Sequence, residues 1–287
     1  MDTSRFRVRP GEMVRLRRRA TADTRPFKHK RKAVDRLKRG LERLVKLQEL
    51  LYAEHRWSLL LVFQGMDAAG KDSAIKHVMS GLNPQGTQVY SFKRPSDEEL
   101  DHDYLWRSVK ALPSRGRIGI FNRSYYEEAL VVKVHPEILA AQQLPPPLVT
   151  PRIWAQRYED INAFERYLAR NGTVIRKFFL HISKEEQRRR LLERLDEPAK
   201  NWKFQAGDLD ERDRWDDYQR AYEQMLSKTS TRHAPWFVVP ADHKWFTRVA
   251  IAEMIADTLA GLDLAYPKQS KEQLVALAEA RRRLARS

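Results

Sequence analysis

The sequence contains no cysteine, and this absence excludes several kinds of site. Among its 287 residues there is no thiol to form a disulfide, to bind zinc or to act as a nucleophile. There is also no apolar run long enough to cross a bilayer, and the N-terminus lacks the apolar region of a signal peptide. We therefore expect a protein of the cytoplasm.

Negative charge is scarce relative to positive charge. The chain has 54 Lys or Arg against 38 Asp or Glu, a net charge of +16, which predicts a polyanionic partner such as nucleic acid, an anionic membrane or a phosphate polymer. Residues 1–40 alone hold 15 Lys or Arg against 4 Asp or Glu. We interpret residues 1–31 as a basic arm on the surface that helps to bind a long polyanion without taking part in the chemistry.

Apolar patterns alternate between strand and helix along the chain. The run SLLLVFQG (58–65) is typical of a parallel strand buried on both faces. Further strands are predicted at 87–92, 116–124, 173–183 and 235–242, and helices at 32–54, 97–111, 152–170, 208–228 and 244–262. The alternation predicts an α/β fold with a parallel five-stranded sheet flanked by helices. We expect one domain at 32–265 and a basic tail at 266–287.

The stretch VFQGMDAAGKDS (62–73) resembles a phosphate-binding loop, or P-loop, because it lies between a strand and a helix. The glycines permit close backbone approach, and successive N–H groups at the helix N-terminus point toward phosphate oxygens. An ordinary strand-to-helix turn with incidental glycines is the alternative. The candidate phosphate-binding residues here are Gly65, Ala68, Ala69, Gly70, Lys71, Asp72 and Ser73.

Two carboxylates in this loop predict a metal ion. The usual P-loop pattern is G-x-x-x-x-G-K followed by Ser or Thr, and Gly65, Gly70 and Lys71 match it. Asp67 lies inside the loop, and Asp72 takes the position where this pattern has Ser or Thr. Carboxylates beside phosphates repel them unless a divalent cation lies between, and Mg²⁺ takes one or two carboxylates plus phosphates and water. We expect Mg²⁺, with Mn²⁺ as an alternative ion. For Asp72, a favourable interaction with the helix dipole is a second explanation.

The stretch IGIFNRSYYEE (118–128) is a second candidate site. Asn122 and Arg123 follow a predicted strand, where α/β sheets bind ligands, and Arg123 is suited to clamp a phosphate. Glu127 is a candidate metal ligand one helical turn further on. An ordinary loop followed by a solvated helix face is the alternative. Arg107, in HDYLWR, is a further candidate for nucleotide binding, together with Asn122 and Arg123.

The basic stretch at about 184–212 is predicted to be a helical lid over bound phosphates. It contributes five candidate phosphate-binding side chains: Arg188, Arg190, Arg194, Lys200 and Lys203. A surface helix crossed by ion pairs explains the same residues equally well.

Taken together, seven motifs in order over roughly residues 48–262 resemble the family-2 polyphosphate kinases. They are GMDAAGKDS, GLNPQG, SFKRPSDEELDHDYLWR, IFNRSYYEEALVVKVHPE, KFFLHISKEEQRRRLLERL, NWKFQAGDLDERDRWDDY and APWFVVPADHKW. The resemblance implies a P-loop kinase fold like that of thymidylate kinase, and Mg²⁺-dependent transfer of phosphate between inorganic polyphosphate and nucleotides. It also implies a homo-oligomer. Asp67, Lys71 and Arg123 match the family's catalytic positions.

The version FNRSYYEE, where many members carry FDRS, resembles the subgroup that phosphorylates both nucleoside mono- and diphosphates. We therefore expect ADP to be converted to ATP and AMP to ADP, with no binding of membranes or nucleic acid. An ATP-dependent nucleotide or metabolite kinase would show the same fold and loop. A polyanion- or nucleic-acid-binding protein is the alternative from another class.

Overall fold

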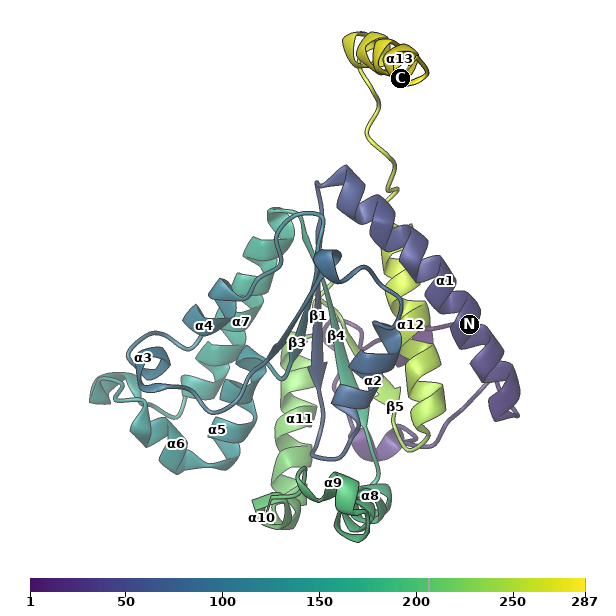
Figure 1. Ribbon diagram of the computed structural model, residues 1–287. Coiled ribbons are helices and arrows are strands. Elements are labelled where there is room, and N and C mark those ends of the chain that lie inside the picture. The colour runs from purple at the N-terminus through teal and green to yellow at the C-terminus, as the bar shows by residue number, and fades with distance from the viewer. Residues whose placement is uncertain (206, 287) are drawn as a thin grey trace.

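Five parallel strands form the central sheet in the order β2-β3-β1-β4-β5 (Figure 1). The computed structural model describes residues 1–205 and 207–286. Its strands are β1 (Ser58–Gln64), β2 (Thr87–Ser91), β3 (Ile118–Asn122), β4 (Thr173–His181) and β5 (Trp236–Pro240). Every residue of β1 and β3 is buried, as their continuous apolar sequences predict. The predicted parallel five-stranded sheet is confirmed.

Helices cover both faces of the sheet (Figure 1). One face carries α1 (Lys30–Glu54), α2 (Lys71–Val78) and α12 (Lys244–Ala260), and the other carries α7 (Ile153–Arg170) and α11 (Trp215–Thr229). Around these lie the short elements α3 (Asp97–Leu100), α4 (Trp106–Lys110), α5 (Val131–Val134), α6 (Pro136–Ala141), η1 (Ser4–Phe6), η2 (Leu16–Arg18), η3 (Pro84–Gly86), η4 (Tyr125–Ala129) and η5 (Pro146–Leu148). Within residues 1–205 and 207–286, no helix combines the length and apolarity needed to cross a membrane.

The helix predicted at 97–111 is broken in two, α3 and α4. A capping box at Ser96 and Glu99 starts α3. The carboxylate of Asp103 accepts a hydrogen bond from the backbone N–H of Leu105, at 2.9 Å, just before α4 begins. Short polar side chains compete in this way with the helical hydrogen bonds, so the chain turns where periodicity alone predicts one helix.

The predicted lid region consists of α8 (Lys184–Asp196), α9 (Pro198–Asn201) and α10 (Gly207–Asp213), below the C-terminal ends of the strands in Figure 1. Of the predicted lid and tail, residues 206 and 287 lie outside the described residues. The tail helix α13 (Lys271–Leu284) stands away from the sheet at the end of an extended segment (Figure 1).

The first 31 residues differ from the surface arm that their charge suggests. Phe6, Val8, Val14 and Leu16 are buried in the main hydrophobic core. The backbone N–H of Val8 donates to the carbonyl of Trp236 at 2.9 Å, so this segment covers the outer edge of β5. The interpretation as an arm is therefore wrong for the backbone and the apolar side chains.

A buried ion pair joins β4 to α7. Lys177 in β4 and Glu165 in α7 are fully buried, with 2.6 Å between Nζ and Oε2. Lys177 also donates to the Tyr126 hydroxyl and the Thr229 carbonyl, both at 2.7 Å, while Tyr125 and Tyr126 donate to Glu165. Burial lowers the pKa of Lys177 to about 8, against the opposing effect of Glu165. This network fixes η4, the turn that follows Arg123.

Candidate active site

The loop between β1 and α2 has the backbone shape that its glycines predict. A Cβ on Gly65 would lie 2.9 Å from the carbonyl oxygen of Leu180 in β4, so only glycine fits there. Gly70 has φ +99° directly before α2. Ala68, which is not a glycine, also has a left-handed φ of +60°. Such a conformation in a non-glycine residue is held by its surroundings and is common at functional sites.

Lys71 folds back onto the loop. Its Nζ donates to the carbonyl oxygens of Gly65 at 2.6 Å and Met66 at 3.3 Å. Burial lowers the pKa of the Lys71 ammonium from its ordinary value, and the positive charge of Arg123 lowers it further. The ammonium is thus a buried cation that an incoming anion would stabilise.

Arg123 joins the two candidate motifs. Its Nη2 lies 2.9 Å from Oδ1 of Asp67, and its Nη1 lies 3.4 Å from Oε2 of Glu127. Arg123 also has a left-handed φ of +63° at the end of β3. The negative charges of Glu127 and then Asp67 raise the pKa of Arg123 well above its ordinary value. The guanidinium remains charged and is held at the mouth of the loop.

Asp72 and Ser73 contact neighbouring elements. The Asn122 amide donates to Oδ1 of Asp72 at 2.6 Å, and Arg248 donates to the Ser73 hydroxyl at 2.8 Å. Among the described residues, the buried Oδ1 of Asn122 has no hydrogen-bond partner. Asn122 therefore connects the end of β3 to the first turn of α2.

A cavity of about 650 Å³ opens over the loop. Twelve predicted site residues line it: Asp67, Ala68, Gly70, Lys71, Asp72, Ser73, Asn122, Arg123, Arg190, Arg194, Lys200 and Lys203. In all, nine Lys or Arg but only three Asp or Glu line this cavity. Its charge is suited to a substrate with several negative charges.

The sequence model of the polyphosphate kinase 2 family matches residues 28–267. The chain belongs to this family.

Relatives and a solved structure agree over nearly the whole length. The chain is 50% identical over 285 residues to the ADP-polyphosphate phosphotransferase of Rhodopseudomonas palustris, covering 99% of each chain. It is 47% identical over 265 residues to the AMP/ADP-polyphosphate phosphotransferase of Meiothermus ruber, covering 92% of this chain and 95% of that one. The crystal structure of polyphosphate kinase 2 from Arthrobacter aurescens superposes with a TM-score of 0.87 at 40% identity, covering 96% of this chain and 94% of that one.

Four predicted binding residues of this polyphosphate kinase 2 chain do not line the main cavity: Gly65 and Ala69, which line two smaller cavities beside the loop, and Arg107 and Arg188. Arg107 lines a separate cavity of about 600 Å³, pairs with Glu99 at 3.2 Å and donates to the carbonyl of Lys93. Arg188 is exposed on α8 and pairs with Glu185 on the same helix. For Arg188, the alternative of a surface helix with internal ion pairs describes the structure better.

Arg190 lines the cavity, but its hydrogen bonds are already made. A guanidinium has five N–H donors, and those of Arg190 contact four backbone carbonyls and Glu186. The prediction that it binds phosphate is therefore not supported by the geometry, since it would first have to leave these partners. Arg194 makes weaker contacts, to Asp208 at 3.2 Å and to the carbonyl of Lys203 at 3.5 Å.

No one cavity contains all three predicted metal ligands. Asp67 and Asp72 line the cavity of about 650 Å³, and Asp67 also lines a cavity of about 240 Å³ with Glu127, Asp208 and Glu211. Burial, and then the negative charge of Asp67, raises the pKa of Asp208. Among the described residues, no three such side chains are close enough to bind an ion by themselves. Carboxylate oxygens do fit a divalent cation that also takes ligands from phosphates.

Several lining residues were not predicted. Lys93 and Arg94 lie two and three residues after β2, much as Arg123 follows β3, and so reach the same edge of the sheet. Their place after a strand was a usable signal. Lys244 begins α12, far along the chain, and only the fold brings it to the cavity. Ser91, Phe92, Glu193 and Gln205 complete the lining.

Proposed function

We propose that this chain transfers a phosphoryl group between inorganic polyphosphate and nucleotides, converting ADP to ATP and AMP to ADP. The observation that carries the proposal is the excess of cations in the cavity over the P-loop. Membership of the polyphosphate kinase 2 family supports it. The names of the two relatives differ in whether AMP is an acceptor, so the AMP reaction needs its own test.

The lining favours polyphosphate over ATP as the donor. The lid region and α12 contribute Arg194, Lys200, Lys203 and Lys244 to the cavity. Among the described residues that line this cavity, the one aromatic side chain is Phe92, on the opposite side at the end of β2. The lid side of this cavity therefore offers contacts for phosphates, and Trp202, an exposed ring of the lid region, is not among the lining residues.

The acceptor is proposed to bind on the β2–β3 side. Arg123 and Asn122 would contact its phosphate, and Lys93 and Arg94 extend the positive charge beside them. Pro95, the next residue, already lines the cavity that contains Arg107. A nucleoside in that second space would leave its phosphate near the P-loop.

In the proposed reaction, an oxygen of the acceptor phosphate attacks the terminal phosphorus of the polyphosphate chain. The bond between that phosphorus and the bridging oxygen breaks in line, and the shortened chain leaves with the electron pair. Lys71 would exchange its bonds to Gly65 and Met66 for phosphate oxygens, and Arg123 would stabilise the charge that develops. The loop N–H groups from Gly65 to Ser73 would hold the phosphate in place.

A divalent cation, Mg²⁺ or Mn²⁺, would be held by Asp67 and Glu127 with the substrate phosphates, and it would supply further neutralisation of charge. Asp72 remains a candidate for orienting its waters. We expect the enzyme to act in the cytoplasm as a homo-oligomer, which light scattering would test, and to require no nucleic acid.

The test is transfer from long-chain polyphosphate to ADP and, separately, to AMP, with nucleotides measured by chromatography. We expect ATP from ADP, ADP from AMP, and no product when EDTA removes divalent ions. ATP from ADP alone would keep the donor and remove AMP as an acceptor. No product from either acceptor, with ATP consumed by another substrate, would identify an ATP-dependent kinase instead.

Lys71→Ala, compared with Arg188→Ala, tests the site. Removing a buried charge that stabilises the transition state typically lowers kcat about 100- to 1,000-fold. Arg188 is an exposed arginine of the same basic region, so its removal should change kcat by less than about twofold. Equal losses in the two variants would mean that the P-loop has no special part in the reaction.

A further inference from the structure

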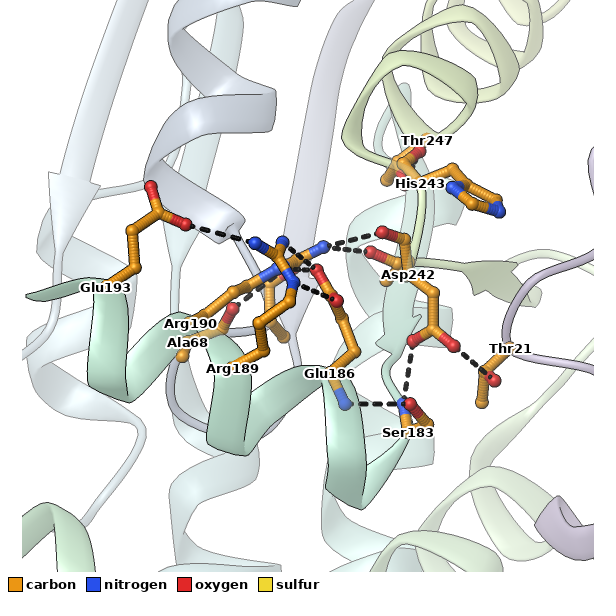
Figure 2. Close-up of polar contacts among 12 residues, drawn as sticks. Thr21, Ala68, Ser183, Glu186, Arg189, Arg190, Glu193, Asp242, His243 and Thr247 are labelled. Carbon is orange, nitrogen blue, oxygen red and sulfur yellow. Dashed lines mark hydrogen bonds and ion pairs between the residues drawn. The ribbon is translucent and has the colours of Figure 1, made fainter.

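Arg190 is the most enclosed cation of the lid region, although α8 lies at the edge of the molecule. The residue is only 4% exposed. Figure 2 shows its guanidinium pointing from α8 toward the P-loop and the end of β5. A phosphate-binding arginine would be expected to point its donors into the cavity.

Each N–H donor of Arg190 has a partner within the protein. Nη1 donates to the carbonyls of Ala68 at 3.0 Å and Ala69 at 2.9 Å. Nη2 donates to the carbonyls of Ala241 at 2.6 Å and Asp242 at 3.1 Å, and Nε donates to Glu186 at 2.7 Å. Since a guanidinium has five donors, none is left for a substrate.

These bonds act on the loop backbone itself. A peptide group is planar and trans, so holding the Ala69 carbonyl also fixes the N–H of Gly70, which points the opposite way. Ala68 has the left-handed φ of +60° and needs outside support. Arg190 thus holds the two peptide groups before α2, of which the N–H of Ala69 donates to the Met66 carbonyl at 3.1 Å and the N–H of Gly70 would meet a phosphate.

Arg190 also connects the P-loop to the N-terminus of α8 through Asp242, whose carbonyl oxygen it contacts. The Asp242 carboxylate accepts hydrogen bonds from the Ser183 backbone N–H at 2.8 Å and from the Thr21 hydroxyl at 2.7 Å (Figure 2). The Ser183 hydroxyl caps α8 by accepting from the N–H of Glu186. The P-loop, the lid helix, β5 and the N-terminal segment therefore meet at one junction.

The preceding arginine provides a natural contrast. Arg189 is 59% exposed and pairs with Glu186 and Glu193 on its own helix (Figure 2). Among the described residues, its polar partners are Glu186 and Glu193 and none belongs to the loop, yet it shares the Glu186 carboxylate with Arg190. Its replacement removes the same charge from the same helix and leaves the loop contacts intact.

We propose that Arg190 is a positioning residue for the proposed phosphoryl transfer: it holds the P-loop in its phosphate-binding shape and ties it to the lid helix, and it does not bind the polyphosphate. This inference rests on the proposed function for its kinetic consequences. Its structural part, the support of the loop, stands independently of which substrate is used.

The kinetic experiment compares Arg190→Lys and Arg190→Gln with Arg189→Gln in transfer from polyphosphate to ADP. A misplacement of about 1 Å at a reacting centre costs on the order of 100-fold, so we expect such a loss of kcat in both Arg190 variants. The KM for polyphosphate and its dependence on salt should stay close to wild type. A lysine keeps the charge but cannot span four carbonyls, so it should not restore the rate.

The opposite result identifies a phosphate contact. If Arg190 binds the donor chain, its loss raises the KM for polyphosphate, weakens the salt dependence by about one ion, and lysine restores part of the activity. That pattern would overturn the proposal. Restoration of kcat in Arg190→Ala by guanidinium, at concentrations far below those that unfold proteins, would support it, and Arg189→Ala should show no such response.

A measurement without substrate separates this inference from the proposed function. Amide hydrogen exchange in residues 62–73, followed by mass spectrometry, should accelerate in Arg190→Gln and Arg190→Lys and remain as in wild type in Arg189→Gln. Unchanged exchange in both Arg190 variants would overturn the supporting role, even if wild type transfers phosphate. Absence of transfer by wild type, with faster exchange in the variants, would instead refute the proposed function alone.

Discussion

The two ends of the chain are both basic, but of their described residues only those at the N-terminal end pack into the hydrophobic core. Residues 1–29 carry nine Lys or Arg, and residues 266–287 carry six. Near the N-terminus, Val8 and Leu16 are almost completely buried. Near the C-terminus, Leu274 and Leu277 on α13 are more than half exposed. Basic composition therefore does not tell whether a terminal segment belongs to the folded body.

The difference lies in what each segment meets. The N-terminal segment covers the free edge of β5, where Val8 donates to Trp236, and it packs Phe6 against Phe246 with 6.1 Å between the ring centroids. An uncovered edge strand exposes a row of unpaired N–H and C=O groups. The C-terminal helix instead completes its hydrogen bonds within itself and begins with a capping box at Ser270.

The largest effect is expected from deleting residues 1–29. The deletion would expose the edge of β5 and the buried rings around Phe246, so we expect aggregation or a lowered unfolding temperature, with loss of activity as a consequence. Thermal unfolding and size-exclusion chromatography would measure this. The matched control removes residues 268–287, which should leave the unfolding temperature unchanged. A chain without residues 1–29 that unfolds like wild type would restore the idea of a dispensable arm.

A single side chain at each end sharpens the same comparison. Leu16→Ala should reduce the free energy of unfolding by about 2–5 kcal/mol, since it leaves a cavity in the core. Leu277→Ala should change it by less than about 0.5 kcal/mol. Denaturation by urea would give both values. Similar losses at the two positions would mean that α13 is packed in solution.

The smallest effect concerns His181, which holds the N-terminal segment from β4. Its Nε2 lies 3.2 Å from the carbonyl oxygen of Leu16 and 3.1 Å from that of Arg19. Burial lowers the pKa of His181 below its ordinary value of 6.5, although the two carbonyls and the charge of Asp242 oppose this. The ring therefore takes up a proton more readily in the unfolded chain.

His181 therefore contributes to the free energy of unfolding above pH 6.5, and this contribution is lost as the pH falls below that value. His181→Gln should reduce this part of the pH dependence, which unfolding curves between pH 5 and about pH 8 would reveal. Deletion of residues 268–287 should leave the dependence unchanged. A wild-type stability that rises as the pH falls through this range would contradict the assignment.

The sheet and the loop were predictable because they depend on local sequence. The five central residues of β1, Leu59 to Phe63, are all apolar and can form a strand covered on both faces, and the Gly65–Lys71 spacing belongs to one continuous turn. The prediction of a single helix at 97–111 was wrong because the Asp103 carboxylate accepts a hydrogen bond from the backbone of Leu105 where the periodicity indicates a continuous helix. The burial of the N-terminal segment was not predicted because its apolar residues are separated by arginines, and because its partner, β5, lies more than 200 residues away in the sequence.

The site was predicted in composition more accurately than in geometry. Lys71, Arg123 and Asp67 belong to motifs, and the structure brings them together. The roles of Arg188, Arg189 and Arg190 could not be separated from sequence, since neighbouring residues on a helix point in different directions. Only the fold shows that Arg190 faces the carbonyls of the loop and that Arg188 faces its own helix.

The strand order has a consequence for redesign. β2 is an edge strand, hydrogen-bonded only to β3, whereas β1 and its loop are enclosed between β3 and β4. Residues Phe92 to Pro95 extend from that edge and border both the main cavity and the neighbouring one. Residues 92–95 can therefore be varied to change the proposed acceptor without altering the strands that hold the P-loop. The loop itself should be kept unchanged, because only glycine fits at position 65.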